Sequence, residues 1–202
     1  MTPKTRIYLI RHGEVEGGGT GVRRYNGQTD VALSERGKAM YHSLTERLAG
    51  TRIAACYTSD LTRCAWGAEL LGAHLGVRPV PHPELRELNM GTWEGKSWDE
   101  LKAQHPDEWR ARFADIVNYR VPGGENVVDV HRRVMPVIDG IVERHRGEEV
   151  LVVAHGGVNR VILLNAIGAP LSSLFAIEQT YCCLNVIDYF ADGNAVVKLL
   201  NG

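Results

Sequence analysis

Two histidines and an arginine stand where buried strands are expected to end. Arg11 and His12 directly follow the apolar residues 7–10, and His155 directly follows the apolar residues 150–154. In open α/β sheets, ligands bind beyond the carboxyl ends of the strands. A neutral imidazole is a nucleophile, and arginine binds anions through a planar fork of donors. These residue types at these positions therefore predict chemistry on an anion.

A phosphate monoester is an anion that suits this set of residues. It carries about two negative charges near neutral pH, it accepts hydrogen bonds from arginine and from a helix N-terminus, and its leaving group needs a proton. Arg63, one turn into the helix expected after the second strand, is placed to face the same sheet edge. Glu87 lies in an irregular stretch and is the candidate general acid. The predicted site has His12, Glu87 and His155 as catalytic groups, and Arg11, Arg63, His155 and Gly156 as phosphate-binding groups.

Each of these residues also has a simpler interpretation. A single histidine at a strand end is more often a hydrogen-bonded structural residue. Arg63 alone is a solvated helix residue, and Glu87 alone is a surface charge. The arginines of a later, highly charged helix are interpreted as a solvated face: Arg132, Arg133 and Arg146. The functional interpretation rests on two strand-end histidines coinciding with an adjacent arginine.

The composition favours one globular domain over residues 1–202. Hydrophobic residues make up 44% of the chain, and the net charge of −1 gives no general attraction to nucleic acid or to an anionic membrane. The cysteines at positions 56, 64, 182 and 183 have neither a disulfide-framework nor a metal-binding spacing, so all four are expected to be buried and reduced. No histidine pair has metal-site spacing, and no cofactor is expected. Without a signal-peptide pattern or a membrane span, the chain is expected to be soluble and cytoplasmic.

Strand and helix patterns alternate along the chain. Strands are predicted at 6–10, 52–57 and 149–154, and helices at 34–49, from Ser59 or Asp60 to 75, from Ser97 onward, at 126–146 and at 158–167. Residues 77–95, which contain three prolines, are predicted to be irregular. Two further strands between 183 and 200 are joined at Asp192 and Gly193. This order predicts a three-layer α/β/α sandwich with a mainly parallel central sheet.

Six segments, taken in their order, resemble the histidine phosphatase superfamily, also called the phosphoglycerate mutase-like family. They are LIRHGE at 9–14, YNGQTDVALSERG at 25–37, YTSDLTRC at 57–64, ELRELNMGTWEG at 84–95, PGGEN at 122–126 and VLVVAHGGVNR at 150–160. The RHG triplet alone is a weak signal, whereas the ordered set is specific and covers most of the chain. The resemblance implies a phosphoglycerate mutase-like fold.

The resemblance also implies a mechanism that agrees with the one expected from the residues. His12 is phosphorylated and then hydrolysed, Arg11, Arg63 and His155 surround the phosphoryl group, Glu87 donates the proton, and no metal is required. One departure is visible, because many members have an asparagine where this chain has Gly18, inside a glycine-rich stretch. Either backbone N–H groups replace that side chain, or the loop is mobile until substrate binds.

The superfamily contains both phosphatases and mutases. Residues 95–101 include Lys96 as their single basic residue, together with two acids, which favours a phosphatase over a mutase that grips a second phosphate. The chain looks similar to the α-ribazole 5′-phosphate phosphatases of cobalamin biosynthesis and to broad-specificity members. The expected partner is thus a small phosphorylated metabolite. Phosphoglycerate mutase activity, or binding of a phosphorylated ligand or protein without efficient turnover, is an alternative.

Two further features leave alternatives open. Five aromatic side chains could line an apolar wall for a large leaving group or could belong to the core or an interface: Trp93, Trp98, Trp109, Tyr25 and Tyr119. The apolar strands near the end of the chain could pair across a homodimer or could form the ordinary edge of a monomer's sheet.

Overall fold

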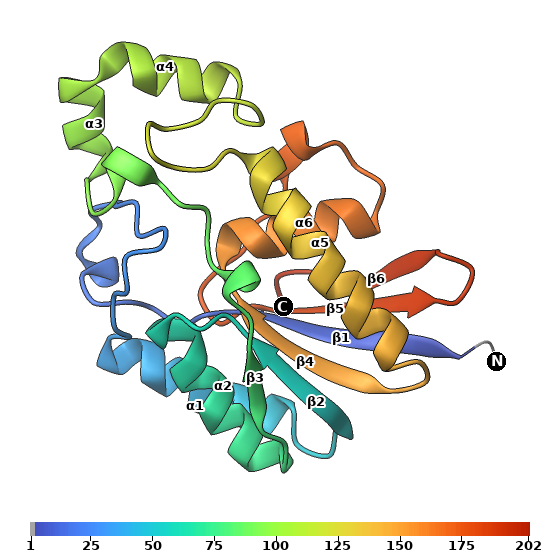
Figure 1. Cartoon of the computed structure of the whole chain (residues 1–202). Coiled ribbons are helices and arrows are strands. Elements are labelled where there is room, and N and C mark those ends of the chain that lie inside the picture. Colours follow the sequence, from blue (N-terminus) through green and yellow to red (C-terminus); the bar gives the residue numbers. More distant parts are fainter. Residues whose placement is uncertain (1–2) are drawn as a thin grey trace.

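A six-stranded sheet forms the centre of the computed structural model, which describes residues 3–202 (Figure 1). The strand order is β3-β2-β4-β1-β5-β6. The strands are β1 (Lys4–Arg11), β2 (Ile53–Thr58), β3 (Pro79–Pro81), β4 (Glu149–Ala154), β5 (Leu184–Phe190) and β6 (Ala195–Leu199). The first four run parallel, β5 is antiparallel to β1, and β6 is antiparallel to β5. The predicted mainly parallel sheet and its C-terminal hairpin are confirmed.

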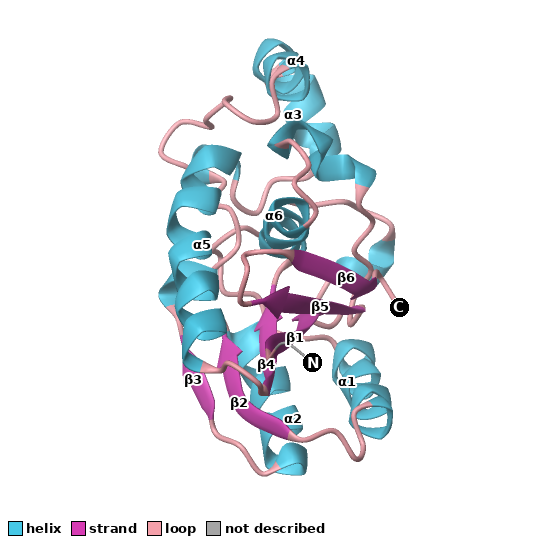
Figure 2. Ribbon diagram, turned by 90° about the vertical axis from the view of Figure 1, so that its right-hand side faces the viewer, coloured by secondary structure: helices cyan, strands magenta, loops and turns pink. Residues whose placement is uncertain are grey.

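Helices cover both faces of this sheet. The α-helices are α1 (Glu35–Arg47), α2 (Thr62–Leu75), α3 (Trp98–Gln104), α4 (Pro106–Ala114), α5 (Val127–Arg144) and α6 (Gly156–Ala166), and the 3-10 helices are η1 (Gly18–Thr20), η2 (Pro83–Leu85), η3 (Gly91–Trp93) and η4 (Leu171–Ala176). Successive side chains of a strand point to opposite faces. Val150 and Val152 therefore pack with α5 and α6, whereas Leu151 and Val153 pack with α1 and α2. Figure 2 shows the resulting three layers, as predicted.

The parallel pairing of β1 with β4 brings the two predicted histidines together. The register places Ile10 opposite Val153 and Arg11 opposite Ala154. His12 and His155 are the next residue on each strand, so both side chains leave the sheet at the same edge. The helices α3 and α4 lie beyond this edge, apart from the three layers (Figure 1).

The helix α2 begins later than the sequence predicted. Its N-cap is Leu61, rather than Ser59 or Asp60. The side chain of Asp30 accepts hydrogen bonds from the backbone N–H of Thr62 at 2.8 Å and from its hydroxyl at 2.6 Å. A residue far away in the sequence thus satisfies the donors that a local cap would satisfy. The two residues that were predicted as caps bind other side chains instead. The Ser59 hydroxyl is hydrogen-bonded to His155, and the Asp60 carboxylate accepts a hydrogen bond from Arg86.

The stretch predicted to be irregular contains the short strand β3. It pairs with β2 through Pro79 opposite Cys56 and Pro81 opposite Thr58. Proline lacks a backbone donor and is tolerated where a strand lies at the edge of a sheet. Because β3 is the terminal strand of this sheet, its prolines do not interrupt the ladder.

All four cysteines are buried and unpaired, as predicted. Within residues 3–202, no helix combines the length and the apolar character needed to cross a membrane.

Candidate active site

The hydrogen bonding of His12 leaves one ring nitrogen available for chemistry. Its Nδ1 lies 2.8 Å from the carbonyl oxygen of Gly13. A carbonyl oxygen only accepts, so Nδ1 must carry the proton in the neutral ring, and Nε2 keeps a lone pair. The side chain is buried in the fold yet lines the floor of a pocket. His12 is therefore oriented as a nucleophile through Nε2.

Its surroundings hold this imidazole in the neutral form. Burial lowers the pKa of His12 well below the ordinary 6.5, and the positive charges of Arg11 and Arg63 lower the pKa further. The hydrogen bond to Gly13 acts in the opposite direction but does not reverse the shift. Neutrality matters because only the unprotonated ring has an electron pair to give.

His155 lies directly beside His12 and is the N-cap of α6. The two ring centres are 5.1 Å apart, with the rings edge to face. Arg63 Nε donates to His155 Nδ1 at 3.3 Å, so Nε2 carries the proton and donates to the hydroxyl of Ser59 at 2.9 Å. Burial lowers the pKa of His155 well below 6.5, helped by the charge of Arg63. In this structure His155 is fully buried and supports the site from behind the pocket wall.

Backbone carbonyls fix the guanidinium of Arg63, which the sequence placed at this edge. It donates to the oxygens of Asn26 at 3.0 Å, Gly27 at 2.5 Å and Thr29 at 2.8 Å. The side chain is buried and reaches the pocket beside His12. These hydrogen bonds fix the position of the Arg63 guanidinium. The alternative interpretation of Arg63 as a solvated helix residue is therefore wrong.

A carboxylate that the sequence analysis left without a role holds the loop around Arg63. Glu94 accepts hydrogen bonds from the N–H groups of Gln28 at 2.8 Å, Thr29 at 3.2 Å and Met90 at 2.9 Å, and from the Thr29 hydroxyl at 2.7 Å. Its only signal in the sequence was its place in the segment GTWEG. Glu94 thus sets the position of Arg63 through the carbonyls of the loop.

Arg11 enters the pocket from the end of β1. Its Nη1 donates to the carbonyl of Gln179 at 2.5 Å, and its guanidinium lies 4.2 Å from the ring centre of Tyr181. Among the described residues, none bonds to its buried Nε. A Cβ atom at Gly156 would lie 3.2 Å from that nitrogen, so the glycine allows the close approach. Tyr181 was not among the predicted site residues, because no motif surrounds it in the sequence.

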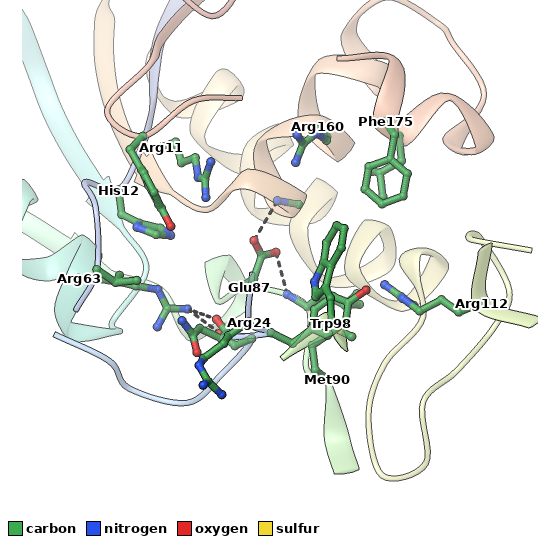
Figure 3. A pocket seen from close by; sticks show the side chains of 18 residues that line it. Arg11, His12, Arg24, Arg63, Glu87, Met90, Trp98, Arg112, Arg160 and Phe175 are labelled. Atoms are coloured by element: carbon green, nitrogen blue, oxygen red, sulfur yellow. Dashed lines mark hydrogen bonds between the residues drawn. The ribbon is translucent and has the colours of Figure 1, made fainter. Parts of the chain in front are cut away.

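Glu87 faces the same pocket from the segment before η3 (Figure 3). Its carboxylate accepts from the backbone N–H of Leu88 and from that of Gly157 in the first turn of α6, each at 2.9 Å. A Cβ atom at position 157 would lie 2.4 Å from the Glu87 carboxylate, so a side chain there would displace Glu87. Glu87 is thereby tied to the helix that follows His155.

The interpretation of Arg133 as part of a solvated face is wrong. Its side chain is 19% exposed and pairs with both oxygens of Glu125, at 2.8 and 2.9 Å. It also donates to the carbonyls of Arg86 at 2.7 Å and Glu87 at 3.1 Å. Arg132, its neighbour in the sequence, is 76% exposed as expected. Arg133 therefore anchors the backbone that carries Glu87.

The pocket continues past Glu87 toward α4. Its far part is lined mainly by apolar and aromatic side chains: Leu88, Met90, Trp98, Leu174 and Phe175. Of the five aromatic residues considered above, Tyr25 and Trp98 line the pocket. Trp93, Trp109 and Tyr119 pack against one another behind it, with Trp93 and Trp109 stacked at 6.1 Å.

Gly18 lies in η1, at the mouth of an adjoining hollow that shares Arg11 and Tyr181 with the pocket. A Cβ atom there would lie 3.3 Å from the Tyr181 hydroxyl and 3.2 Å from Glu14. A bulkier residue would need these neighbours to shift. The absence of a side chain at position 18 therefore allows this loop to lie close to Glu14 and Tyr181.

The profile of the histidine phosphatase superfamily (branch 1) matches residues 7–202. The chain belongs to the histidine phosphatase superfamily. That profile spans both strand-end histidines and the segments around Arg63 and Glu87, so the resemblance noted in the sequence is confirmed.

Relatives within the superfamily include proteins named as mutases and as phosphatases. The chain is 31% identical, over 185 residues, to a probable phosphoglycerate mutase GpmB of Yersinia pestis; the match covers 91% of this chain and 85% of that protein. Bacillus stearothermophilus YhfR has a TM-score of 0.87, 31% identity and 96% coverage of both chains. A putative alpha-ribazole-5′-P phosphatase from Escherichia coli has a TM-score of 0.89 and 27% identity, covering 98% of this chain and 96% of its own. These likenesses confirm the phosphoglycerate mutase-like fold.

Proposed function

We propose that this histidine phosphatase superfamily member is a metal-independent phosphomonoesterase that works through a phosphohistidine on a small phosphorylated metabolite. The observation that carries the proposal is the state of His12. Its Nδ1 is bound to Gly13, its pKa is lowered, and its Nε2 is left with a lone pair beside Arg11 and Arg63. This is the arrangement that nucleophilic attack on phosphorus needs.

In the first step, His12 Nε2 attacks phosphorus and the bond from phosphorus to the ester oxygen breaks. Glu87, in its protonated form, gives its proton to the departing oxygen, which leaves as an alcohol. Arg11 and Arg63 stabilise the negative charge on the phosphoryl oxygens in the transition state. His155 stays neutral and keeps Arg63 and His12 in place.

In the second step, water attacks the phosphohistidine. Glu87, now a carboxylate, takes a proton from that water, and the bond between phosphorus and Nε2 breaks. Inorganic phosphate leaves, and both His12 and Glu87 return to their starting forms. One water is consumed for each ester, so no further reactant is required.

A mutase is the second candidate, supported by the likeness to a probable phosphoglycerate mutase. A mutase would transfer the phosphoryl group from His12 back to its substrate, whereas a phosphatase transfers it to water. Residues 95–101 offer Lys96 alone to hold a second phosphate, which favours hydrolysis. Incubation with 3-phosphoglycerate and a trace of 2,3-bisphosphoglycerate separates the two reactions, because a mutase interconverts the phosphoglycerates and releases little phosphate.

Hydrolysis of p-nitrophenyl phosphate in the presence of EDTA tests the reaction class. We expect turnover by the wild-type protein, an acid-labile phosphoprotein after rapid quenching, and neither with His12→Ala. Turnover no faster than that of His12→Ala, from acid to neutral pH, would contradict the proposal. Loss of activity in EDTA that added metal restores would contradict its metal independence.

For the substrate, α-ribazole 5′-phosphate belongs in a screen of phosphorylated metabolites because a structural neighbour is named for it. Its aromatic base suits an apolar pocket. Preferential hydrolysis of this compound would support a role in cobalamin biosynthesis, whereas similar rates on many esters would indicate a broad-specificity phosphatase.

A further inference from the structure

A buried arginine without an acidic partner lies at the far end of the pocket. Arg112, on α4, is 3% exposed and lines the pocket. Within residues 3–202, no carboxylate pairs with it, and its Nε and Nη1 have no hydrogen-bond partner and are shielded from water. The uncharged hydroxyl of Tyr25 is the polar group that interacts with its guanidinium. Leaving a buried charge unpaired is costly, and proteins retain such charges mainly where a partner group compensates them.

The neighbours of Arg112 do not neutralise it. Its guanidinium lies 5.8 Å from the ring centre of Tyr25, a weakly attractive cation–π arrangement. Glu108, one turn earlier on α4, is directed elsewhere: its Oε2 lies 3.4 Å from Trp93 Nε1 and 3.8 Å from His105 Nδ1. The positive charge of Arg112 therefore faces the pocket unbalanced.

The other cations of the far pocket differ from Arg112 because each has a protein partner. Arg24 donates to the carbonyl of Gly95 at 3.1 Å and lies 3.6 Å from Glu100. Arg160 donates to the carbonyl of Ile177 at 2.7 Å. Arg112 is thus the cation in this part of the pocket that is left for a ligand.

Its position relative to His12 decides which part of a substrate would meet it. In Figure 3, Arg112 points into the pocket from the side opposite His12 and Arg63, with Glu87 and Trp98 between them. The intervening wall is lined mainly by apolar side chains, including Met90 and Phe175. A phosphate group at His12 would place the leaving group along this wall and its far end at Arg112.

We propose that Arg112 binds a carboxylate at the far end of the leaving group, so that the preferred substrates are phosphomonoesters of hydroxy acids with an apolar middle. The proposal rests on the phosphatase function proposed above. Arg112 offers one positive charge without an acidic partner, which matches the single charge of a carboxylate. The Arg112 subsite selects among substrates and leaves the reaction at His12 unchanged.

Matched pairs of substrates test the subsite. Each pair consists of a phosphorylated straight-chain hydroxy acid and its methyl ester, in a series of increasing chain length. We expect one range of lengths in which the acid has a KM about 10- to 100-fold lower than the ester, as expected for hydrogen bonds to a charged group. Arg112→Met should remove this difference by raising the KM of the acid, with little change in kcat.

Arg110→Met is the matched control. Arg110 lies on the same helix, is 72% exposed and pairs with Asp107, so its loss should leave the preference for the acid unchanged. Equal KM values for acid and ester at every length, or a preference that survives Arg112→Met, would overturn the proposal. If neither acids, esters nor p-nitrophenyl phosphate react faster with the wild type than with His12→Ala, the phosphatase function itself has failed.

The stability of the Arg112→Met variant distinguishes a role of Arg112 in ligand binding from a role in packing. Arg112→Met removes an unpaired buried charge and keeps an apolar side chain of similar length. We expect its midpoint of urea unfolding to equal or exceed that of the wild type, as expected of a group kept for function. A large fall in that midpoint, accompanied by equal losses on acids and esters, would assign Arg112 to packing and overturn the proposal.

Discussion

The backbone N–H of Gly157 donates to the carboxylate of Glu87 across 2.9 Å, which ties the candidate general acid to the helix that follows His155. A side chain at position 157 would push this carboxylate aside, because a Cβ atom there would lie 2.4 Å from it. The position of the acid therefore depends on a residue that has no side chain.

Gly157→Ala should displace Glu87 and slow the step that needs its proton. We expect kcat on alkyl phosphates to fall about 100-fold, as small displacements of a catalytic group can do, and to fall less on aryl phosphates, whose leaving groups need less help. Glu87→Gln should give the same ranking. The control is Gly140→Ala, because a Cβ atom at this exposed position of α5 meets nothing within 4 Å. Equal losses on alkyl and aryl esters would contradict the role of Glu87.

Arg133→Ala should act on the same step from further away. The substitution frees the carbonyls of Arg86 and Glu87 and removes the ion-pair partner of the Glu125 carboxylate. We expect kcat on alkyl phosphates to fall about 10- to 100-fold and the free energy of unfolding to fall by about 2 kcal/mol. Steady-state kinetics and urea unfolding measure the two effects. Arg132→Ala, at an exposed position, should change neither, and a similar loss in both variants would refute the assigned anchor.

Glu94→Gln should weaken phosphate binding through the loop that holds Arg63. The amide nitrogen of glutamine cannot accept from the Thr29 N–H, so one side of the loop loses its support. We expect the inhibition constant for inorganic phosphate to rise about tenfold, equivalent to about 1.4 kcal/mol. Glu35→Gln, which alters an 89% exposed carboxylate, is the control. An unchanged inhibition constant for the Glu94 variant would show that the loop positions Arg63 without this carboxylate.

The buried histidines should make stability depend on pH. Burial and nearby positive charges lower the pKa of both His12 and His155 below 6.5, so below this pH the unfolded chain binds more protons than the folded one. Stability is therefore complete above about pH 7 and falls as the pH decreases. Urea unfolding between about pH 5 and 8 should show a smaller fall for His155→Gln than for the wild type. The exposed His42 supplies the control, and a fall as large in His155→Gln as in His42→Gln would refute the assignment.

The convergence of His12 and His155 could be predicted from sequence because it depends on strand ends. Each histidine follows an apolar run, and adjacent parallel strands deliver such residues to one edge. The alternating order of strands and helices also predicted a sheet with helices on both faces. Local pattern and sheet geometry thus agree at the centre of the site.

The supporting residues could not be predicted, because their partners are distant in the chain. Asp30 caps α2 from a loop that precedes α1. Arg133 lies on a charged helix, where a solvated position is the ordinary expectation, yet its partners are backbone carbonyls of another segment. Arg112 carries no motif, and its burial depends on how α4 packs against Tyr25. Such contacts follow from tertiary packing and leave no periodic trace in the sequence.

Because α3 and α4 lie apart from the three layers, the outer wall of the pocket can change in sequence independently of the sheet. The candidate phosphoryl contacts are fixed to strand ends and first helical turns, whereas α3, α4 and η4 supply side chains of the opposite wall, among them Trp98, Arg112 and Phe175. Mutations in these outer segments can accumulate without disturbing the reacting atoms. Evolution, or an engineer who grafts residues 96–121 from a related enzyme, could thus exchange the group attached to the phosphate while keeping the candidate reaction site around His12 intact.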